Sequence, residues 1–313
     1  MKFKSIDLYE DKPIYIIFEI TRECNYNCLY CTYKKKNLRL SVGNIKNIID
    51  KLSLSSEIFD IDFMGGEVTL HPDLVEIIKY SLIKLKNSTI HISTNLSNPL
   101  SYFVSFNNQL NKCDISRLVF YATYHSSTDI YKFKEKIKYL YDNGYRIYLK
   151  FLCDSEKFEY MKNCYDILNQ HECEKFFVKY LWNYRENNTY SDEYLEWMKQ
   201  SSYDNGDVFY IKWEDDGKII TKDYTYIELK DANLDIFKGY YCRMNRLLCI
   251  NVMGAIVSVC KRNSSSILEP HKIGNAFTIK DFDCVFSHKN DLIKCPYEEC
   301  TELFNNPYKC RRP

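Results

Sequence analysis

The chain has 313 residues and 14 cysteines, and its 43 basic residues nearly balance 42 acidic ones, giving a formal net charge of +1. This balance excludes a global attraction for nucleic acid, and we interpret the basic run at residues 34–36 as a solvated loop. Without a signal peptide or a long apolar span, so many cysteines argue against a secreted disulfide scaffold and favour a reducing cytoplasm.

Short β-branched or aromatic runs alternate with longer helical stretches up to residue 182, which predicts an α/β fold with a parallel sheet. Six strands are expected, at residues 14–20, 58–64, 89–94, 117–122, 146–152 and 175–181. Helices are expected between them, at residues 42–52, 72–85, 102–111, 128–143 and 157–169.

Three cysteines follow the first predicted strand with C-x3-C-x2-C spacing, namely Cys24, Cys28 and Cys31. Three thiolates on a short loop can hold three corners of a 4Fe-4S cluster, which leaves the fourth iron open to a substrate or cofactor. A zinc site or three structural cysteines are the alternatives, and the spacing alone does not decide between them. Other residues must therefore be considered.

Two further motifs lie at the ends of the next two predicted strands. Gly65-Gly66-Glu67 ends the second, where glycines let the backbone approach a ligand closely and a carboxylate can accept hydrogen bonds from an ammonium group. Ser93 and Asn95 end the third, where their side chains can bind hydroxyl groups. The carboxyl ends of the strands are also where barrel enzymes carry their functional groups.

In this order, the three motifs resemble those of the radical S-adenosylmethionine (SAM) superfamily. The resemblance implies a partial (β/α)6 TIM-type barrel with a 4Fe-4S cluster on the three cysteines. It also implies that Glu67 accepts the SAM amino group, that Ser93 and Asn95 bind the ribose, and that SAM is cleaved reductively to a 5′-deoxyadenosyl radical that abstracts hydrogen from a substrate.

Three more residues are candidates at the mouth of such a barrel. Tyr30 matches the aromatic position of the family near adenine, with packing onto the barrel as the alternative. His125, where relatives carry a small polar or acidic turn, could orient substrate or move a proton, or be structural. Lys150 could reach inward to the SAM carboxylate or point outward into solvent.

The alternation stops near residue 182, and we expect a linker with a hairpin over residues 183–230, turning at Glu214–Gly217. The remainder, residues 231–313, holds seven of the 14 cysteines. Its pattern resembles the auxiliary-cluster extension called SPASM, or its shorter twitch form. We therefore expect three parts, with residues 1–182 forming the barrel and residues 231–313 the auxiliary domain.

The resemblance implies one auxiliary 4Fe-4S cluster, next to a hairpin that turns at Gly254. The expected ligands are Cys242, Cys260, Cys295 and Cys300, with Cys310 competing for the last place. The match is imperfect, because five residues rather than four separate Gly254 from Cys260. Zinc is the alternative, since four thiolates also suit that ion. Cys249 and Cys310 are also candidates for returning a hydrogen atom to a substrate radical.

The substrate is the least determined feature. Because the first predicted strand begins near residue 13, we expect no N-terminal peptide-recognition domain, which favours a small-molecule, saccharide or nucleotide-linked substrate undergoing oxidation, rearrangement or epimerisation. A peptide or protein maturase is the alternative, with the peptide delivered by another protein. The alternative that is not an enzyme is a catalytically inactive iron-sulfur or zinc scaffold. A flavodoxin- or ferredoxin-type electron donor is expected, and neither a membrane nor nucleic acid is expected as a partner.

Overall fold

The structure is a computed structural model that describes part of the chain. The described residues are 13–28, 30–31, 36–168, 172–180, 190–201, 203–204, 209–215, 218–224, 241–242, 246–258, 272–287 and 293–294.

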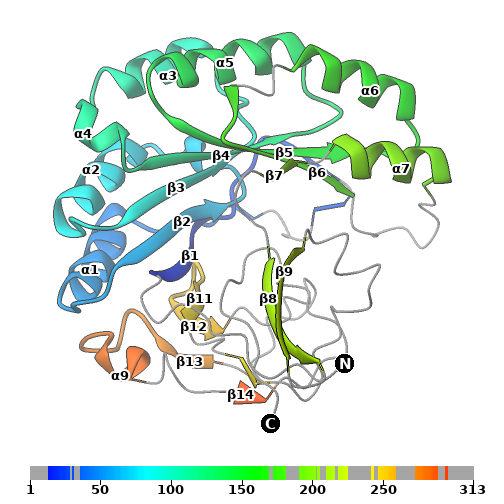
Figure 1. Cartoon of the computed structure of the whole chain (residues 1–313). Coiled ribbons are helices and arrows are strands. Elements are labelled where there is room, and N and C mark those ends of the chain that lie inside the picture. The colour runs from blue at the N-terminus through cyan, green and yellow to red at the C-terminus, as the bar shows by residue number, and fades with distance from the viewer. Residues whose placement is uncertain are drawn as a thin grey trace.

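Six parallel strands follow one another across the main sheet in chain order. They are β1 (Ile14–Thr21), β2 (Phe59–Gly65), β3 (Thr89–Thr94), β4 (Leu118–Tyr124), β5 (Arg146–Cys153) and β6 (Lys175–Tyr180). All six strands expected from the sequence are thereby confirmed, with shifts of no more than two residues at their ends. Figure 1 shows the helices along the outer side of this sheet, so the expected α/β partial barrel is confirmed.

The helices that cover the sheet also agree with expectation, with two exceptions. The described helices are α1 (Val42–Ser53), η1 (Val68–Leu70, 3-10), α2 (Leu74–Lys84), α3 (Leu100–Asn107), α4 (Lys112–Ile115), α5 (Ile130–Asp142), α6 (Phe158–Ile167), α7 (Asp192–Ser201) and α9 (Asp283–Phe286). The single helix expected over residues 102–111 is wrong, because the chain instead forms α3 and α4. Asn111 begins α4 with a reciprocal capping box to Asp114, and asparagine favours such caps over helix interiors.

The second exception is α7, which lies inside the segment expected to be a linker with a hairpin. Its buried residues Tyr194 and Met198 lie on one side of the helix, and the ring of Tyr194 stacks on Phe158 of α6 with centroids 4.2 Å apart. The hairpin itself is confirmed, since β8 (Phe209–Asp215) pairs antiparallel with β9 (Lys218–Tyr224).

The two faces of the sheet differ in chemistry. Alternate residues of β1, from Ile14 to Ile20, pack into the large core beneath the helices. The residues between them, Tyr15, Ile17 and Glu19, lie on the opposite face. On that face, a smaller apolar cluster joins Ile17 to Cys249 of the C-terminal region. Polar side chains are thus concentrated on the face that the helices leave uncovered.

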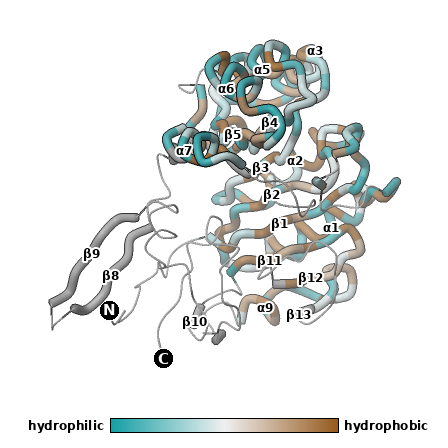
Figure 2. The backbone as a smooth tube through the Cα atoms, turned by 90° about the vertical axis from the view of Figure 1, so that its right-hand side faces the viewer, coloured by the Kyte–Doolittle hydropathy of each residue, from teal (hydrophilic) through white to brown (hydrophobic). Residues whose placement is uncertain are grey.

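The C-terminal region extends the same sheet. β11 (Leu247–Ile250) pairs parallel with β1, and β12 (Ala255–Ser258) and β13 (Lys272–Asn275) follow antiparallel. Figure 2 shows β11 and β12 continuing the sheet beside β1. The expected hairpin at Gly254 is confirmed. Gly254 has a φ of +76°, and the Phe277 ring lies 2.6 Å from where a Cβ would stand. Both features favour glycine at this position.

Three short strands complete the described structure. β7 (Tyr203–Asp204) pairs antiparallel with β6 at the far edge of the sheet. β10 (Tyr241–Cys242) pairs antiparallel with β14 (Ile293–Lys294) in a separate sheet. Within the described ranges, no helix has the length and apolar character needed to cross a membrane.

Candidate active site

The three motif cysteines lie on the cysteine loop, residues 22–38, which leaves the carboxyl end of β1. An antiparallel bridge between Thr21 and Arg39 closes the base of this loop. Cys24 and Cys28 are half-buried, and Cys31 is exposed. The backbone N–H of Cys31 donates to the carbonyl oxygen of Cys28 at 3.0 Å, so these two cysteines belong to one turn.

Burial raises the pKa of two of these thiols, Cys24 and Cys28. Partial burial raises the pKa of Cys24, although the backbone N–H of Tyr26, 3.4 Å from its Sγ, acts in the opposite direction. The negative potential of Glu67 and of the other two thiols raises the same pKa further. Burial also raises the pKa of Cys28. A bound cation would favour the thiolate forms of Cys24 and Cys28 and so act against the effect of burial.

Three thiolates are the donor set that a 4Fe-4S cluster takes at three of its corners. In the part of the chain that the structure describes, no three His, Cys, Asp or Glu side chains gather closely enough to hold one metal ion. A 4Fe-4S cluster instead takes one thiolate at each corner, so its ligands are spread apart. Cys24, Cys28 and Cys31 on one partly exposed loop fit that requirement, with one corner lacking a cysteine of the loop.

The Gly65-Gly66 pair packs against the backbone at the end of β1 and the beginning of the cysteine loop. Gly66 N donates to Thr21 O at 3.0 Å, and Glu67 N donates to Glu23 O at 2.7 Å. A Cβ on Gly65 would stand 1.8 Å from Thr21 O, and one on Gly66 would stand 2.1 Å from Glu23 O. The glycines therefore allow two protein backbones to approach, a reason that the sequence motif alone did not reveal.

Glu67 lies at the centre of a buried hydrogen-bond network. Its side chain is 1% exposed, and its Oε1 accepts from Thr69 N, Thr69 Oγ1 and Thr94 Oγ1 at 3.1, 2.6 and 2.6 Å. Its Oε2 accepts from Asn95 N at 2.6 Å. Burial raises the pKa of Glu67, and these hydrogen bonds counteract that effect. The carboxylate thus joins the ends of β2 and β3, and its contact with SAM remains a prediction.

The two predicted ribose ligands have different surroundings. Asn95 Nδ2 donates to Asn25 Oδ1 at 3.2 Å, which places this side chain against the cysteine loop. Ser93 instead donates to Asp62 Oδ1 at 2.7 Å, and Tyr15 donates to Asp62 Oδ2 at 3.3 Å. Asn95 therefore lies near the cysteine loop, whereas Ser93 belongs to the polar face of the sheet.

Tyr30 and His125 are brought together at the mouth of the barrel. Their rings are nearly parallel with centroids 6.0 Å apart, and the Tyr30 hydroxyl lies 2.5 Å from His125 Nδ1. Burial lowers the pKa of His125 to about 4, so the imidazole is neutral near pH 7 and can accept the hydroxyl hydrogen at Nδ1. Cys28 Sγ lies 3.9 Å from the same nitrogen.

Lys150 lies on the face of the sheet opposite the helices, as expected for an inward side chain. Its Nζ is 4.1 Å from the centroid of the Tyr121 ring. Tyr121 packs edge-on against Tyr148 of β5, with ring centroids 5.4 Å apart. A contact between Lys150 and the SAM carboxylate remains a prediction.

The predicted auxiliary site is described only in part. Cys260, Cys295, Cys300 and Cys310 lie outside the described residues, and only the backbone strand of Cys242 is described. Cys249 is buried on β11, opposite Ile17 in the parallel register. Of the other described cysteines, Cys113 and Cys284 are exposed, whereas Cys153, Cys164 and Cys173 are buried.

Several residues of this site were missed from the sequence. Thr69, Thr94 and Asn25 complete the network around Glu67 and Asn95. Thr94 directly precedes Asn95, so its place at a strand end was the available signal. Nothing in the local sequence indicated Asn25, because its partner lies 70 residues away.

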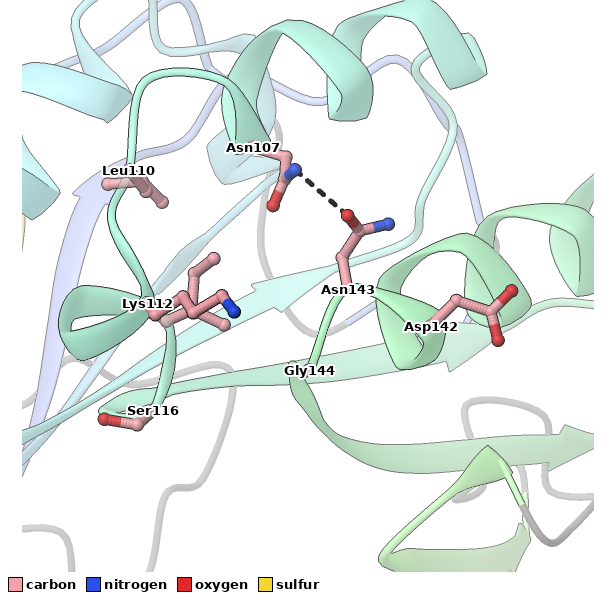
Figure 3. A pocket seen from close by; sticks show the side chains of 8 residues that line it. Asn107, Leu110, Lys112, Ser116, Asp142, Asn143 and Gly144 are labelled. Atoms are coloured by element: carbon pink, nitrogen blue, oxygen red, sulfur yellow. Dashed lines mark hydrogen bonds between the residues drawn. The ribbon is translucent and has the colours of Figure 1, made fainter.

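A pocket of about 550 Å³ lies elsewhere, where α3, α4 and the end of α5 meet (Figure 3). Asn107 Nδ2 donates to Asn143 Oδ1 at 3.1 Å across it, and Lys112 and Asp142 also line it. The lining residues Ser116 and Gly144 lie two positions before the first residues of β4 and β5. The pocket therefore lies at the amino ends of the strands, where barrel residues usually contribute stability rather than catalysis.

Comparisons with known proteins agree with this geometry. Residues 18–103 match the family described as Radical SAM superfamily. An S-adenosylmethionine-dependent nucleotide dehydratase from Selenomonas ruminantium is 41% identical over 63 residues, which are 20% of this chain and 23% of that protein. Mycofactocin maturase MftC from Mycobacterium tuberculosis is 35% identical over 74 residues, 23% of this chain and 19% of that protein. The matches thus span less than a quarter of the length of these curated relatives.

Solved structures extend the likeness to the fold. Native anSMEcpe with bound AdoMet aligns with a TM-score of 0.59 at 12% identity, over 89% of this chain and 82% of that one. SuiB from Streptococcus suis aligns with a TM-score of 0.55 at 12% identity, over 90% of this chain and 66% of that one. The residues that match this family hold the cysteine and Gly-Gly-Glu motifs, and the solved structures share the fold of this chain.

Proposed function

We propose that the protein is a radical SAM enzyme in which Cys24, Cys28 and Cys31 hold a 4Fe-4S cluster. The observation that carries the proposal is the packing of Gly66 and Glu67 onto Glu23 of the cysteine loop, which joins two motifs of the superfamily into one site. When bound, the cluster would supply the electron that cleaves SAM to a 5′-deoxyadenosyl radical able to abstract hydrogen from a substrate.

The residues of the chain bind and orient in this proposal. Asn95 would bind the ribose beside the cysteine loop, and Glu67 would fix the ends of β2 and β3 that surround the ligand. Tyr30, which belongs to the loop, and the neutral His125 would form a hydrogen-bonded pair beside Cys28. Their packing would keep water from the reacting atoms.

The proposed substrate class is a small molecule, a saccharide or a nucleotide-linked compound. The nucleotide dehydratase among the relatives supports this class, as does the polar face of the sheet with Asp62, Ser93 and Lys150. Peptide maturation is the second candidate, because mycofactocin maturase is similar over 74 residues of this chain.

A second cluster in residues 231–313 remains part of the proposal, with Cys242, Cys260, Cys295 and Cys300, or Cys310, as ligands. The hairpin at Gly254 supports it, because this hairpin lies between Cys242 and Cys260 in the chain and reverses the direction of the chain between them. A flavodoxin- or ferredoxin-type donor and a cytoplasmic location complete the proposal.

Anaerobic reconstitution tests the function. Wild-type protein with SAM and a reductant is expected to release 5′-deoxyadenosine, and the Cys24→Ala, Cys28→Ala, Cys31→Ala variant is expected to release none and to bind about four fewer irons per chain. Cys113→Ala, which removes an exposed thiol far along the chain, is the matched control and should retain both properties. Cluster-loaded wild type that never cleaves SAM with several reductants would instead establish the scaffold alternative.

A further inference from the structure

Lys136 of α5 is a buried cation close to the candidate site. Its side chain is 6% exposed, although it stands on a helix of the outer layer. Its Nζ donates a hydrogen bond to the backbone carbonyl of Leu96, in the loop that follows β3. Because burying an ammonium group is costly without a partner, a lysine here needs a compensating interaction.

The loop that accepts this hydrogen bond has an unusual backbone. Leu96 has a φ of +52° and is the one non-glycine residue with positive φ among those that the structure describes. A left-handed leucine costs about 1 kcal/mol or more and persists only where its surroundings hold it. Lys136 holds Leu96 at the carbonyl, and Thr94 Oγ1 accepts from Leu96 N at 3.0 Å.

The held loop leads directly to the candidate ligand site. Asn95, next to Leu96, donates its backbone N–H to Glu67 and its side-chain Nδ2 to Asn25 of the cysteine loop. The side chains of Lys136 and Glu67 therefore both contact one short segment, residues 94–96. Burial lowers the pKa of Lys136, and nearby carboxylates, Glu135 first and Glu67 least, oppose that effect.

We infer that Lys136 is a positioning residue that sets the loop after β3 and thereby holds Asn95 where the ribose of SAM binds. The inference rests on the proposed function for the identity of the ligand. Lys136 does not touch the ligand in this arrangement. It acts through the backbone of Leu96, which lies beside Asn95.

Binding of SAM to the anaerobically reconstituted protein, measured by equilibrium dialysis, tests the inference. Lys136→Met is expected to weaken binding about tenfold, the usual effect of losing a hydrogen bond to a charged group. Lys138→Met is the matched control, because Lys138 lies on the same helix, is exposed and pairs only with the surface carboxylate of Asp142 among the described residues. It should bind SAM as the wild type does.

A double-mutant cycle separates positioning from general destabilisation. If Lys136 acts through Asn95, then Lys136→Met should weaken binding much less in an Asn95→Ala background than in the wild type. The iron content should stay equal in all variants. Additive effects in the cycle, or unchanged SAM binding in Lys136→Met, would overturn the inference.

Amide hydrogen exchange of residues 94–97, measured without SAM, gives a readout that is independent of the proposed function. Lys136→Met should accelerate exchange there and Lys138→Met should not; equal exchange in both would refute the role of Lys136. If wild-type protein does not bind SAM, the proposed function fails while the exchange experiment still decides whether Lys136 holds the loop. If Lys136→Met does not fold, Lys136→Gln replaces it in the same experiments. This variant keeps an N–H donor and removes the charge.

Discussion

The carboxylate of Glu19 and the guanidinium of Arg22 form a buried ion pair, with Arg22 Nε donating to Glu19 Oε1 at 2.8 Å and Nη2 to Oε2 at 3.2 Å. Val252 N, in the turn of the C-terminal hairpin, also donates to Glu19 Oε2 at 3.0 Å. Arg22 stands two residues before Cys24. One carboxylate therefore connects β1, the beginning of the cysteine loop and the C-terminal hairpin.

Glu19→Gln is expected to destabilise the protein by about 3 kcal/mol, because it leaves the Arg22 cation buried with a neutral partner. It should also lower the iron retained after reconstitution, since the cysteine loop begins at Arg22. Denaturant unfolding and iron analysis measure both effects.

Glu174→Gln provides the matched control for that change. Glu174 accepts a similar two-point contact from Arg146, but at an exposed position. Its loss should therefore cost about 1 kcal/mol or less. Equal costs for the two substitutions would contradict the importance of the buried pair.

Gly66→Ala should disrupt the contact between the Gly-Gly-Glu motif and the cysteine loop. The added Cβ would stand 2.1 Å from Glu23 O, so one of the two backbones must move. We expect a loss of about 1–3 kcal/mol, as for other overpacked sites, together with reduced SAM cleavage. Thermal unfolding and the 5′-deoxyadenosine assay check this.

Gly43→Ala is the corresponding control, because the atom nearest to a Cβ added at Gly43 is Ser41 Oγ, 4.0 Å away. Gly43 lies in α1, where alanine is favoured over glycine by up to about 1 kcal/mol. Stability should be unchanged or higher. A Gly66→Ala protein as stable and active as Gly43→Ala would show that the close approach is unnecessary.

Glu67→Gln should destabilise the protein even when SAM is absent. The carboxylate accepts four hydrogen bonds from protein donors, and an amide would place a donor against Asn95 N or the two threonine hydroxyls. A cost of about 2–3 kcal/mol is expected for a buried mismatch of this kind. Denaturant unfolding of the SAM-free protein measures it, with the half-exposed Glu76→Gln as control. Unchanged stability would mean that Glu67 serves the ligand alone.

Tyr30→Phe should retain the cluster but slow SAM cleavage several-fold. The substitution keeps the ring on His125 and removes the hydroxyl at Nδ1, a hydrogen bond worth about 1 kcal/mol. Kinetics of 5′-deoxyadenosine release and iron analysis test both parts. Tyr131→Phe, which alters an exposed tyrosine, should leave the rate at the wild-type value. Loss of iron in Tyr30→Phe would assign the hydroxyl to cluster binding instead.

The strands and motifs were predictable because their signals are local. Apolar runs bounded by polar residues predicted β1 to β6, and the cysteine spacing and Gly65-Gly66-Glu67 followed directly from residue order. α7 and the division between α3 and α4 were not predicted. In the structure, Tyr194 packs α7 against α6, and the cap at Asn111 begins α4.

The sequence by itself determined an α/β barrel with a cysteine loop after its first strand and polar residues after the next two. Only the tertiary structure decided what those residues contact. Glu67 meets Thr94 and Asn95 across 27 and 28 positions, Lys136 meets Leu96 across 40, and Glu19 meets Val252 across 233. Such pairs form because the sheet brings distant strand ends together and because buried charges require partners. Neither condition can be predicted from residues that are adjacent in the sequence.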